Sequence, residues 1–455
     1  MAKTDSVTAR DPILSLFQSA AAAVSRALHG PAGASDQATL ATAAAQIVSA
    51  ETANPVHLPP SSVFQPALTC AQHGLALLQA LAARDTDQTQ VLLDRLRFSE
   101  CDPLWVETLL RFARLYLPGG TLPPVPYRRH AQMSDFVVTA DAPRLRVALL
   151  SDWATGTHEA RQVAALLAAQ KPDVVIHLGD IYFSGTAEEC RLHFLEPLRA
   201  VLPDTRLFTL CGNHDVYSGG AGYYGLLDQI GQPASYFCLR SPDDSWQILG
   251  ADTGLHDRDP FDETAALTFL EPGEVAWHAD KLRGFAGRTL LLSHHQPFSA
   301  FRQIGPAAEL SPVNPALLAA YGTLAAAGPI DAWFWGHEHQ LRLYAPYRGV
   351  QAGRNIGYGA IPVRATADAN LPLPGLLDPP ELLVPLALDV VDDAYTHGFA
   401  LLDLSPDAIE VSYWAVTRPD APIYRETLPT GRRTPPISPP VLGPIAGLGA
   451  RTRLV

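Results

Sequence analysis

The stretch Leu207–Asp215, with the sequence LFTLCGNHD, joins a short apolar run to a cluster of polar side chains. Its apolar half has the length and composition of a buried strand. Asn213, His214 and Asp215 follow directly after Gly212, and a glycine at this place permits a sharp turn and a close approach of the backbone. The stretch therefore predicts a strand that ends at a site built from amide, imidazole and carboxylate groups.

Four further apolar runs end in a similar way. They lead to Asp152, to Gly179-Asp180, to Ser293-His294-His295 and to Gly336-His337-Glu338-His339. Helical stretches such as Glu159–Ala169 and Thr186–Leu202 alternate with the runs, which is typical of an α/β domain with strands buried on both faces. Because ligands gather outside the carboxyl ends of strands in open α/β sheets, we expect the five strand ends to surround one crevice.

The residue types at these strand ends suit metal ions. Oxygen and imidazole ligands without thiolates favour Mn, Fe, Zn or similar ions over a structural zinc site. A carboxylate such as Asp180 can bridge two ions about 4 Å apart, the spacing of two-metal phosphoryl-transfer sites. A single histidine after a strand is usually structural, but a chance Gly-Asn-His-Asp/Glu is expected only about 0.006 times in a chain of this length. The ordered set therefore predicts a metal site.

The ordered motifs resemble those of the calcineurin-like metallophosphoesterase superfamily. The resemblance spans roughly residues 145–415 and implies an α/β fold of two packed mixed β-sheets flanked by helices, with a dinuclear site at one edge. For one ion it implies the ligands Asp152, Asp180 and His339. For the other it implies Asp180, Asn213, His294 and His337, so that Asp180 bridges the two.

The resemblance also implies an activity. The expected protein is a metal-dependent phosphohydrolase that cleaves a phosphate monoester or diester by attack of a metal-bound hydroxide. Its cofactors would be two divalent or trivalent transition-metal ions, Mn, Fe or Zn. His214 would assist the leaving group and Asp215 would orient its imidazole. The alternative is a catalytically weakened protein that keeps the fold as a binding or scaffold module, but the presence of His214 beside the metal ligands favours the enzyme.

The first motif departs from the common family pattern. It reads Asp152-Trp153-Ala154, where many members have Asp-x-His, and alanine cannot bind a metal. The Asp-Trp opening looks more like the purple acid phosphatase branch, in which a tyrosine three residues after the second aspartate binds iron. Phe183 holds that position here, and the tyrosine is Tyr182, one residue early. The sequence leaves open whether water, Tyr182 or His158 completes the first metal site.

Two features beside the motifs are interpreted from local pattern. Neighbours in a strand point to opposite sides, so we expect His294 rather than His295 to bind metal. The glycine-containing segment that starts at Tyr217 lies just beyond His214. It either lines the mouth of the substrate site or forms a turn before a packed aromatic helix.

The composition limits the partners. The net charge of −13, from 33 basic and 46 acidic residues, disfavours general nucleic-acid binding and adhesion to anionic membranes. The five cysteines are scattered without a CxxC pair, which argues against a disulfide framework and a cysteine zinc site. No apolar run approaches the length of about 18 residues that a membrane helix needs, and the N-terminus is a poor signal peptide. We therefore expect a cytoplasmic protein whose partner is a small-molecule or phosphoester substrate, and the oligomeric state stays open.

The chain divides into three expected regions. In residues 1–140, Asp-Pro and Gly-Pro pairs separate stretches of helical pattern, which predicts a helical N-terminal region. Residues 145–416 form the expected metallophosphoesterase domain, which closes with a hairpin at Phe399–Ala415. Residues 417–455 contain clustered prolines and predict an extended tail.

Overall fold

The computed structural model describes residues 123–258, 267–304, 310–363, 365, 371–391 and 394–430. Most of the helical region expected in residues 1–140 therefore lies outside the described residues. The same holds for residues 431–455 of the expected tail.

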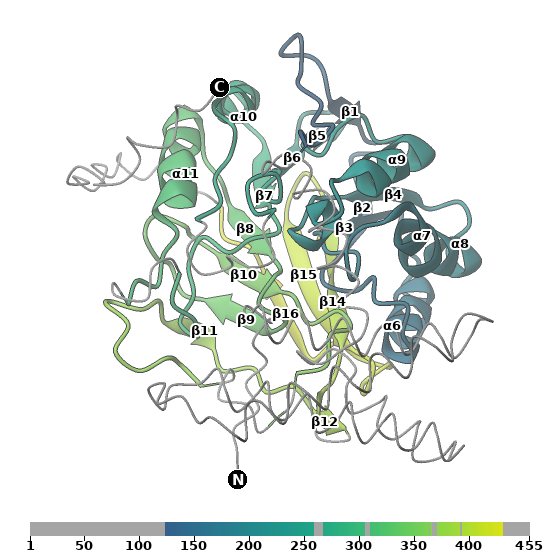
Figure 1. Cartoon of the computed structure of the whole chain (residues 1–455). Helices are drawn as coiled ribbons and strands as arrows, with labels where there is room; N and C mark the ends of the chain where they lie inside the picture. Colours follow the sequence, from purple (N-terminus) through teal and green to yellow (C-terminus); the bar gives the residue numbers. More distant parts are fainter. Residues whose placement is uncertain are drawn as a thin grey trace, which may run out of the picture.

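Two mixed β-sheets pack against each other (Figure 1). The eight-stranded sheet has the order β1 (Val137–Thr139), β5 (Phe237–Arg240), β6 (Trp246–Gly250), β7 (Arg288–Leu292), β8 (Ala332–Trp335), β10 (Gly353–Ile356), β9 (Leu341–Tyr344) and β11 (Leu382–Val384). The six-stranded sheet has the order β16 (Tyr424–Thr427), β15 (Ile409–Ala415), β14 (Gly398–Leu404), β2 (Leu145–Leu150), β3 (Val174–His177) and β4 (Arg206–Thr209). A separate pair is formed by β12 (Val390–Val391) and β13 (Ala394–Tyr395).

Helices cover the outer faces of both sheets (Figure 1). The six-stranded sheet is covered by α6 (His158–Ala169), α7 (Ala187–Glu189), a π-helical turn (Cys190–Leu195), α8 (Glu196–Val201) and α9 (Ala221–Ile230). The eight-stranded sheet is covered by α10 (Pro272–Leu282) and α11 (Pro315–Ala327). The expected fold class is therefore confirmed. Within the described ranges, no helix combines the length and the apolar character that crossing a membrane requires.

Strand β2 shows how the sequence sets these layers. Its side chains Val147 and Leu149 enter the core between the two sheets, while Ala148 and Leu150 pack against the helices. Successive side chains of a strand point to opposite faces, so a strand buried on both faces is largely apolar, and in β2 only the exposed Arg146 is charged. This is why the strands that lead to the polar motifs stand out in the sequence as short continuous apolar runs.

Two expected domain boundaries need correction. Strand β16 lies in the stretch expected as a tail, yet it pairs with β15. Its Glu426 also forms a buried ion pair with Arg354 of β10, with an N–O distance of 2.7 Å, which ties the two sheets together. Strand β1, expected in the N-terminal region, pairs with β5. Short edge strands contain too few apolar residues to show a pattern, so the boundaries drawn from pattern exclude them.

Candidate metal centre

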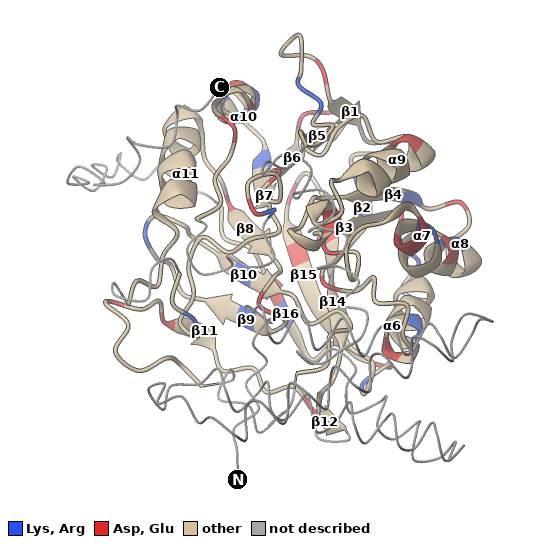
Figure 2. Cartoon of the chain, in the orientation of Figure 1, with Lys and Arg blue, Asp and Glu red and all other residues tan. Residues whose placement is uncertain are grey.

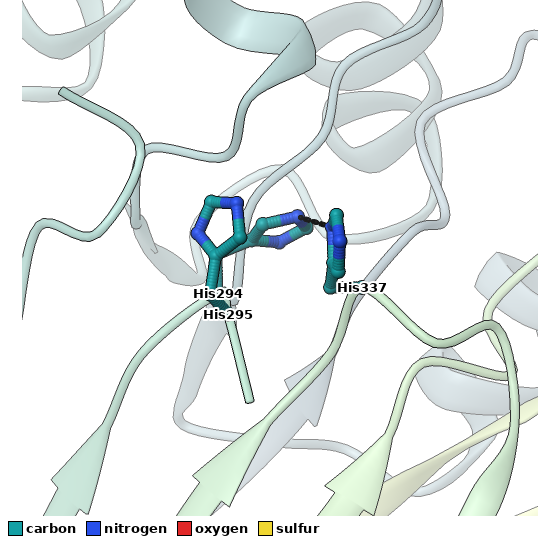
Figure 3. A group of neighbouring side chains, drawn as sticks. All are labelled: His294, His295 and His337. Atoms are coloured by element: carbon teal, nitrogen blue, oxygen red, sulfur yellow. Dashed lines mark hydrogen bonds between the residues drawn. The ribbon is translucent and has the colours of Figure 1, made fainter. Parts of the chain in front are cut away.

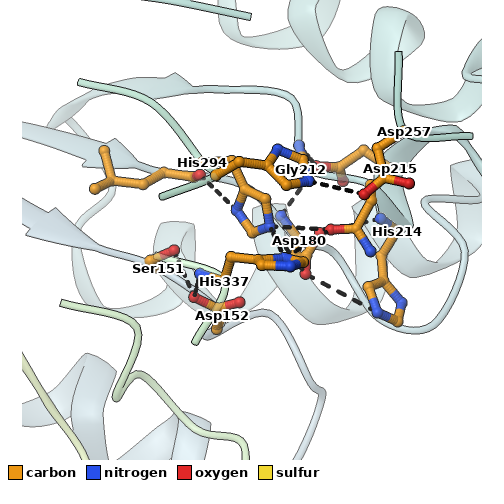
Figure 4. A network of polar contacts seen from close by, with 12 residues as sticks. Ser151, Asp152, Asp180, Gly212, His214, Asp215, Asp257, His294 and His337 are labelled. Carbon is orange, nitrogen blue, oxygen red and sulfur yellow. Dashed lines mark hydrogen bonds and ion pairs between the residues drawn. The ribbon is translucent and has the colours of Figure 1, made fainter. Parts of the chain in front are cut away.

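The polar motifs lie at one edge of the two packed sheets. In the six-stranded sheet, β2, β3 and β4 are parallel and lead to Asp152, Asp180 and Asn213. In the eight-stranded sheet, β7 and β8 are parallel and lead to His294 and to His337. Parallel strands end at the same edge, and Figure 4 shows Asp180 lying among His294, His337 and His214. The structure thus brings the five strand ends together.

Three donor atoms surround Nε2 of His294 and form one group with it. This nitrogen lies 3.1 Å from Oδ1 of Asn213, 3.2 Å from Nδ1 of His337 and 3.3 Å from Oδ2 of Asp180. Nδ1 of His337 is also 3.1 Å from Oδ1 of Asn213. Metal–ligand bonds of about 2.0–2.1 Å place neighbouring ligands of a tetrahedral site about 3.3 Å apart. The atoms of Asn213, His294 and His337 therefore have the mutual separations of ligands around one ion, with Oδ2 of Asp180 at a similar distance from Nε2 of His294.

The opposite nitrogen of His294 fixes how this ring faces the group. Nδ1 lies 2.9 Å from the backbone oxygen of Leu178, to which it can only donate a hydrogen bond. Nε2 is then the nitrogen that would bind a metal once it has lost its proton. A backbone carbonyl holding the second nitrogen is the usual arrangement of a metal-binding histidine.

A second group of donor atoms surrounds the hydroxyl of Tyr182. This oxygen lies 3.0 Å from Oδ1 of Asp152, from Oδ2 of Asp180 and from Nε2 of His339. Because Oδ2 of Asp180 also belongs to the first group, this one atom lies between the two. Of the two side chains that the sequence leaves open for the first metal, Tyr182 therefore lies among the donor atoms, whereas His158 is the exposed first residue of α6.

The two groups bury acidic side chains that need a positive partner. Asp152, Asp180 and Tyr182 are 0%, 1% and 2% exposed. Burial and the two carboxylates raise the pKa of Tyr182 well above its usual value. Although burial opposes ionisation of Asp180, the nearby imidazoles of His294 and His214 hold its pKa well below the usual range. Buried charges require compensation, and a cation among these oxygen and imidazole donors would provide it. The donor set therefore fits transition-metal ions.

The backbone at this edge is strained. Asp152, Asp180, His337 and His339 have φ angles of 55°, 73°, 68° and 49°. Residues other than glycine rarely adopt this left-handed conformation, which costs on the order of 1–3 kcal/mol each and is concentrated at functional sites. A Cβ on Gly212 would lie 2.6 Å from the backbone nitrogen of Asp180, so glycine is required there for the turns to meet.

His214 lies at the border of both groups. Its backbone N–H donates to Oδ1 of Asp180 at 3.0 Å, and its Nε2 lies 4.0 Å from Oδ2 of the same residue. Nδ1 of His214 donates to the backbone oxygen of Phe183 at 2.8 Å. The imidazole packs between the rings of Tyr182 and Tyr217, with centroid distances of 4.5 and 4.9 Å. These contacts hold Nε2 toward the donor groups.

The expected role of Asp215 as the orienting partner of His214 needs correction. The Phe183 carbonyl holds Nδ1 of His214, while the Asp215 carboxylate accepts hydrogen bonds from the backbone. Its three donors are the N–H groups of Asp180, Ile181 and Gly212, at 3.0, 3.1 and 2.7 Å. Asp215 therefore stabilises the turns that carry the donor groups. Sequence adjacency does not reveal this, because His214 and Asp215 lie in one 3₁₀ turn and point in different directions.

His295 lies beside the first group and has other partners. Its ring nitrogens come close enough to those of His294 and His337 for the three to form a potential metal-binding group (Figure 3). However, Nδ1 of His295 lies 2.9 Å from Oγ1 of Thr253, and Nε2 lies 3.1 Å from Oδ2 of Asp257. Since both ring nitrogens are engaged, His295 packs against the group instead of adding a donor to it.

The motif spacing does not reveal the contacts of Glu338, which lies between two histidines of the last motif. Its buried carboxylate accepts hydrogen bonds from Oγ of Ser299 and, at 2.9 Å, from Nδ2 of Asn355. Oγ of Ser299 also accepts the backbone N–H of Arg302 at 3.1 Å. Glu338 therefore anchors the loop that carries Arg302. Burial and the neighbouring histidines lower the pKa of His337, Asp180 opposes this, and the Arg302 guanidinium adds a smaller lowering effect.

Comparison with known proteins defines the class. Residues 145–341 match the model of the calcineurin-like phosphoesterase family. The resemblance of this region to the calcineurin-like phosphoesterases, indicated by the motifs, is thereby confirmed. The chain is 24% identical over 243 residues to tartrate-resistant acid phosphatase type 5 of Rattus norvegicus, covering 47% of this chain and 72% of that protein.

Two solved structures are also similar to this chain. One is the structure of GAP50, the anchor in the inner membrane complex of Plasmodium, with 13% identity, coverage of 64% of this chain and 90% of that chain, and a TM-score of 0.41. The other is a conserved protein of Streptococcus pneumoniae TIGR4 described as a predicted phosphoesterase, with 12% identity, coverage of 62% and 97%, and a TM-score of 0.26.

Proposed function

We propose that the protein is a phosphohydrolase that cleaves phosphate esters at a dinuclear metal centre. The observation that carries the proposal is the position of Oδ2 of Asp180, 3.3 Å from Nε2 of His294 and 3.0 Å from the Tyr182 hydroxyl. The proposed ligands of the first ion are Asp152, Asp180, Tyr182 and His339, and those of the second are Asp180, Asn213, His294 and His337. Two Mn, Fe or Zn ions would supply a nucleophilic water at neutral pH and positive charge opposite the phosphoryl oxygens.

His214 is the proposed proton donor to the leaving oxygen. Because Nδ1 donates to the Phe183 carbonyl, Nε2 is the atom that can hold and release the proton. This atom lies 4.0 Å from Oδ2 of Asp180, at the border of both donor groups. The pair of aromatic rings around the imidazole limits its movement. A positioned acid of this kind contributes about 10²–10⁴-fold to the rate.

Arg302 supports an anionic ester as the substrate. The guanidinium is partly exposed, has a lowering effect on the pKa of both His337 and Glu338, and forms no ion pair within 4.0 Å among the described residues. Guanidinium groups bind phosphate oxygens through parallel hydrogen bonds. Acidic and basic residues are interspersed in the view of Figure 2, and the net charge is −13. These features favour a small phosphate ester over a nucleic acid.

The test is a substrate panel. Chelator-treated protein reloaded with Mn, Fe, Zn, Co or Mg would be assayed with p-nitrophenyl phosphate, bis(p-nitrophenyl) phosphate and a cyclic nucleotide. The acid phosphatase among the relatives makes the monoester the first substrate to test. We expect hydrolysis with at least one transition metal and its loss in Asp180→Asn. Folded protein that binds the ions and hydrolyses none of the substrates would support the scaffold alternative instead.

A further inference from the structure

The side-chain amide of Asn213 has partners at both ends. Oδ1 lies 3.1 Å from Nε2 of His294 and from Nδ1 of His337. At the other end Nδ2 donates a hydrogen bond to the hydroxyl of Tyr217 at 2.5 Å. Only the oxygen end of an amide can bind a metal, since the nitrogen end carries two hydrogens and is a donor. In the observed orientation Oδ1 faces the histidines while Nδ2 keeps a hydrogen-bond partner, the Tyr217 hydroxyl.

Tyr217 is itself fixed next to this amide. The residue caps the 3₁₀ turn His214–Val216 and is 0% exposed. Its ring packs on the His214 imidazole at a centroid distance of 4.9 Å. The Tyr217 hydroxyl, at the end of the turn, therefore contacts the side chain of Asn213, the residue that precedes the turn. Of the two interpretations of this segment, full burial of Tyr217 favours the turn before a packed aromatic helix.

We infer that Tyr217 is a positioning residue: its hydroxyl holds the Asn213 amide with Oδ1 directed at the second metal position. The inference rests on the proposed function, because it concerns ion binding by the group of Asn213, His294 and His337. Hydrogen-bond partners behind metal ligands commonly change metal affinity by about 10–100-fold when they are removed. Loss of this hydroxyl should therefore weaken one of two binding events and leave the other unchanged.

The test is calorimetric titration of chelator-stripped protein with Zn²⁺. Tyr217→Phe keeps the ring on His214 and removes only the hydroxyl, and we expect one affinity to fall by about 10–100-fold. The matched control is Tyr223→Phe. Tyr223 is equally buried, but its hydroxyl donates to the backbone oxygen of Thr209 at 3.0 Å and touches no donor group. This control should leave both affinities unchanged.

A second variant separates orientation from packing. Asn213→Asp has an oxygen at both ends of the side chain, so no orientation presents a nitrogen to the ion. In the Asn213→Asp background, Tyr217→Phe should change the Zn²⁺ affinity by no more than about 2-fold. Deviations of this size are usual even between mutations that do not interact. Equal weakening in Tyr217→Phe and Tyr223→Phe, or an undiminished effect in the Asn213→Asp background, would overturn the inference. Wild-type protein that binds no ion would instead overturn the proposed function.

Discussion

The hydroxyl of Tyr182 lies 3.0 Å from Nε2 of His339, although Tyr182 is one residue early for the tyrosine of the purple acid phosphatase pattern. The backbone N–H of Tyr182 donates to the Ala154 oxygen at 3.0 Å, and Ala154 forms a bridge with Ile181. The two chain segments therefore run side by side at the first metal position. Tyr182 on the second segment therefore lies next to Ala154, where the common family pattern has a histidine.

Tyr182→Phe tests whether the phenol is a ligand. We expect weaker binding of the first ion by at least about 10-fold, since loss of a partner behind a ligand alone costs that much. If the bound ion is ferric, the purified protein should be coloured by a phenolate-to-iron charge-transfer band, and the variant should lack that band. Metal titration and visible spectroscopy measure the two effects. Unchanged affinities and an unchanged spectrum would show that Tyr182 packs beside the metal site without binding the ion.

His214→Ala tests the proton donor. The variant should keep its metal content and lose about 10²–10⁴-fold in turnover on alkyl phosphates, whose leaving oxygen needs a proton. The loss should be smaller for p-nitrophenyl phosphate, because p-nitrophenolate leaves without protonation. Steady-state kinetics on both substrates, with metal content measured in the same samples, make the comparison. Equal losses on the two substrates would indicate a structural role.

Arg302→Gln tests the anion contact. A hydrogen bond to a charged group contributes about 1.5–3 kcal/mol, so KM for a phosphate monoester should rise by about 10–100-fold. Turnover should change less, because the contact is made to the bound substrate as well as to the transition state. Arg348→Gln is the control, since Arg348 is paired with Asp378 on an exposed loop. A KM unchanged from wild type would exclude Arg302 from the substrate site.

Glu274→Gln tests a pH dependence of stability that is independent of the metal ligands. Glu274 is buried on α10, accepts hydrogen bonds from the Tyr127 hydroxyl at 2.9 Å and the Asp252 N–H at 2.8 Å, and burial raises its pKa to about 8. The folded state favours the protonated form of Glu274. The contribution of this group to the free energy of unfolding is therefore full below about pH 4.5 and is lost as the pH rises through about 8.

The Glu274→Gln variant cannot ionise at this position, so it does not lose this stability as the pH rises. Its Tm relative to wild type should therefore increase between pH 5 and pH 9, by an amount corresponding to a few kcal/mol at most. Thermal unfolding at several pH values measures the difference. A difference that does not vary with pH would show that Glu274 ionises normally in the folded protein.

The ligand-bearing strands could be predicted from the sequence because of where they lie. Strands β2 and β8 coincide with the apolar runs Leu145–Leu150 and Ala332–Trp335, since each is buried on both faces. Strands β10 and β16 show no such run. Buried Arg354 of β10 is stabilised by Glu426 of β16, a partner 72 residues away that no local pattern reveals.

The candidate site divides in the same way. The donors Asn213, His294 and His337 follow strand ends, where spacing and residue type identify them. The phenol of Tyr182, the Phe183 carbonyl on His214 and the Tyr217 hydroxyl depend on how loops fold back on one another. Such contacts leave no periodic signal, so the sequence names the donors but not the groups that hold them in place.

The central claim, that hydrolysis depends on ions held by the two groups around Asp180, is tested most directly by measuring metal content and hydrolysis of p-nitrophenyl phosphate in the same samples. Chelator-stripped protein should be inactive, and activity should return as transition-metal content rises toward two ions per chain. Asp180→Asn should lose both metal and activity. Full hydrolysis by wild-type protein that elemental analysis shows to be free of transition metal would contradict the account.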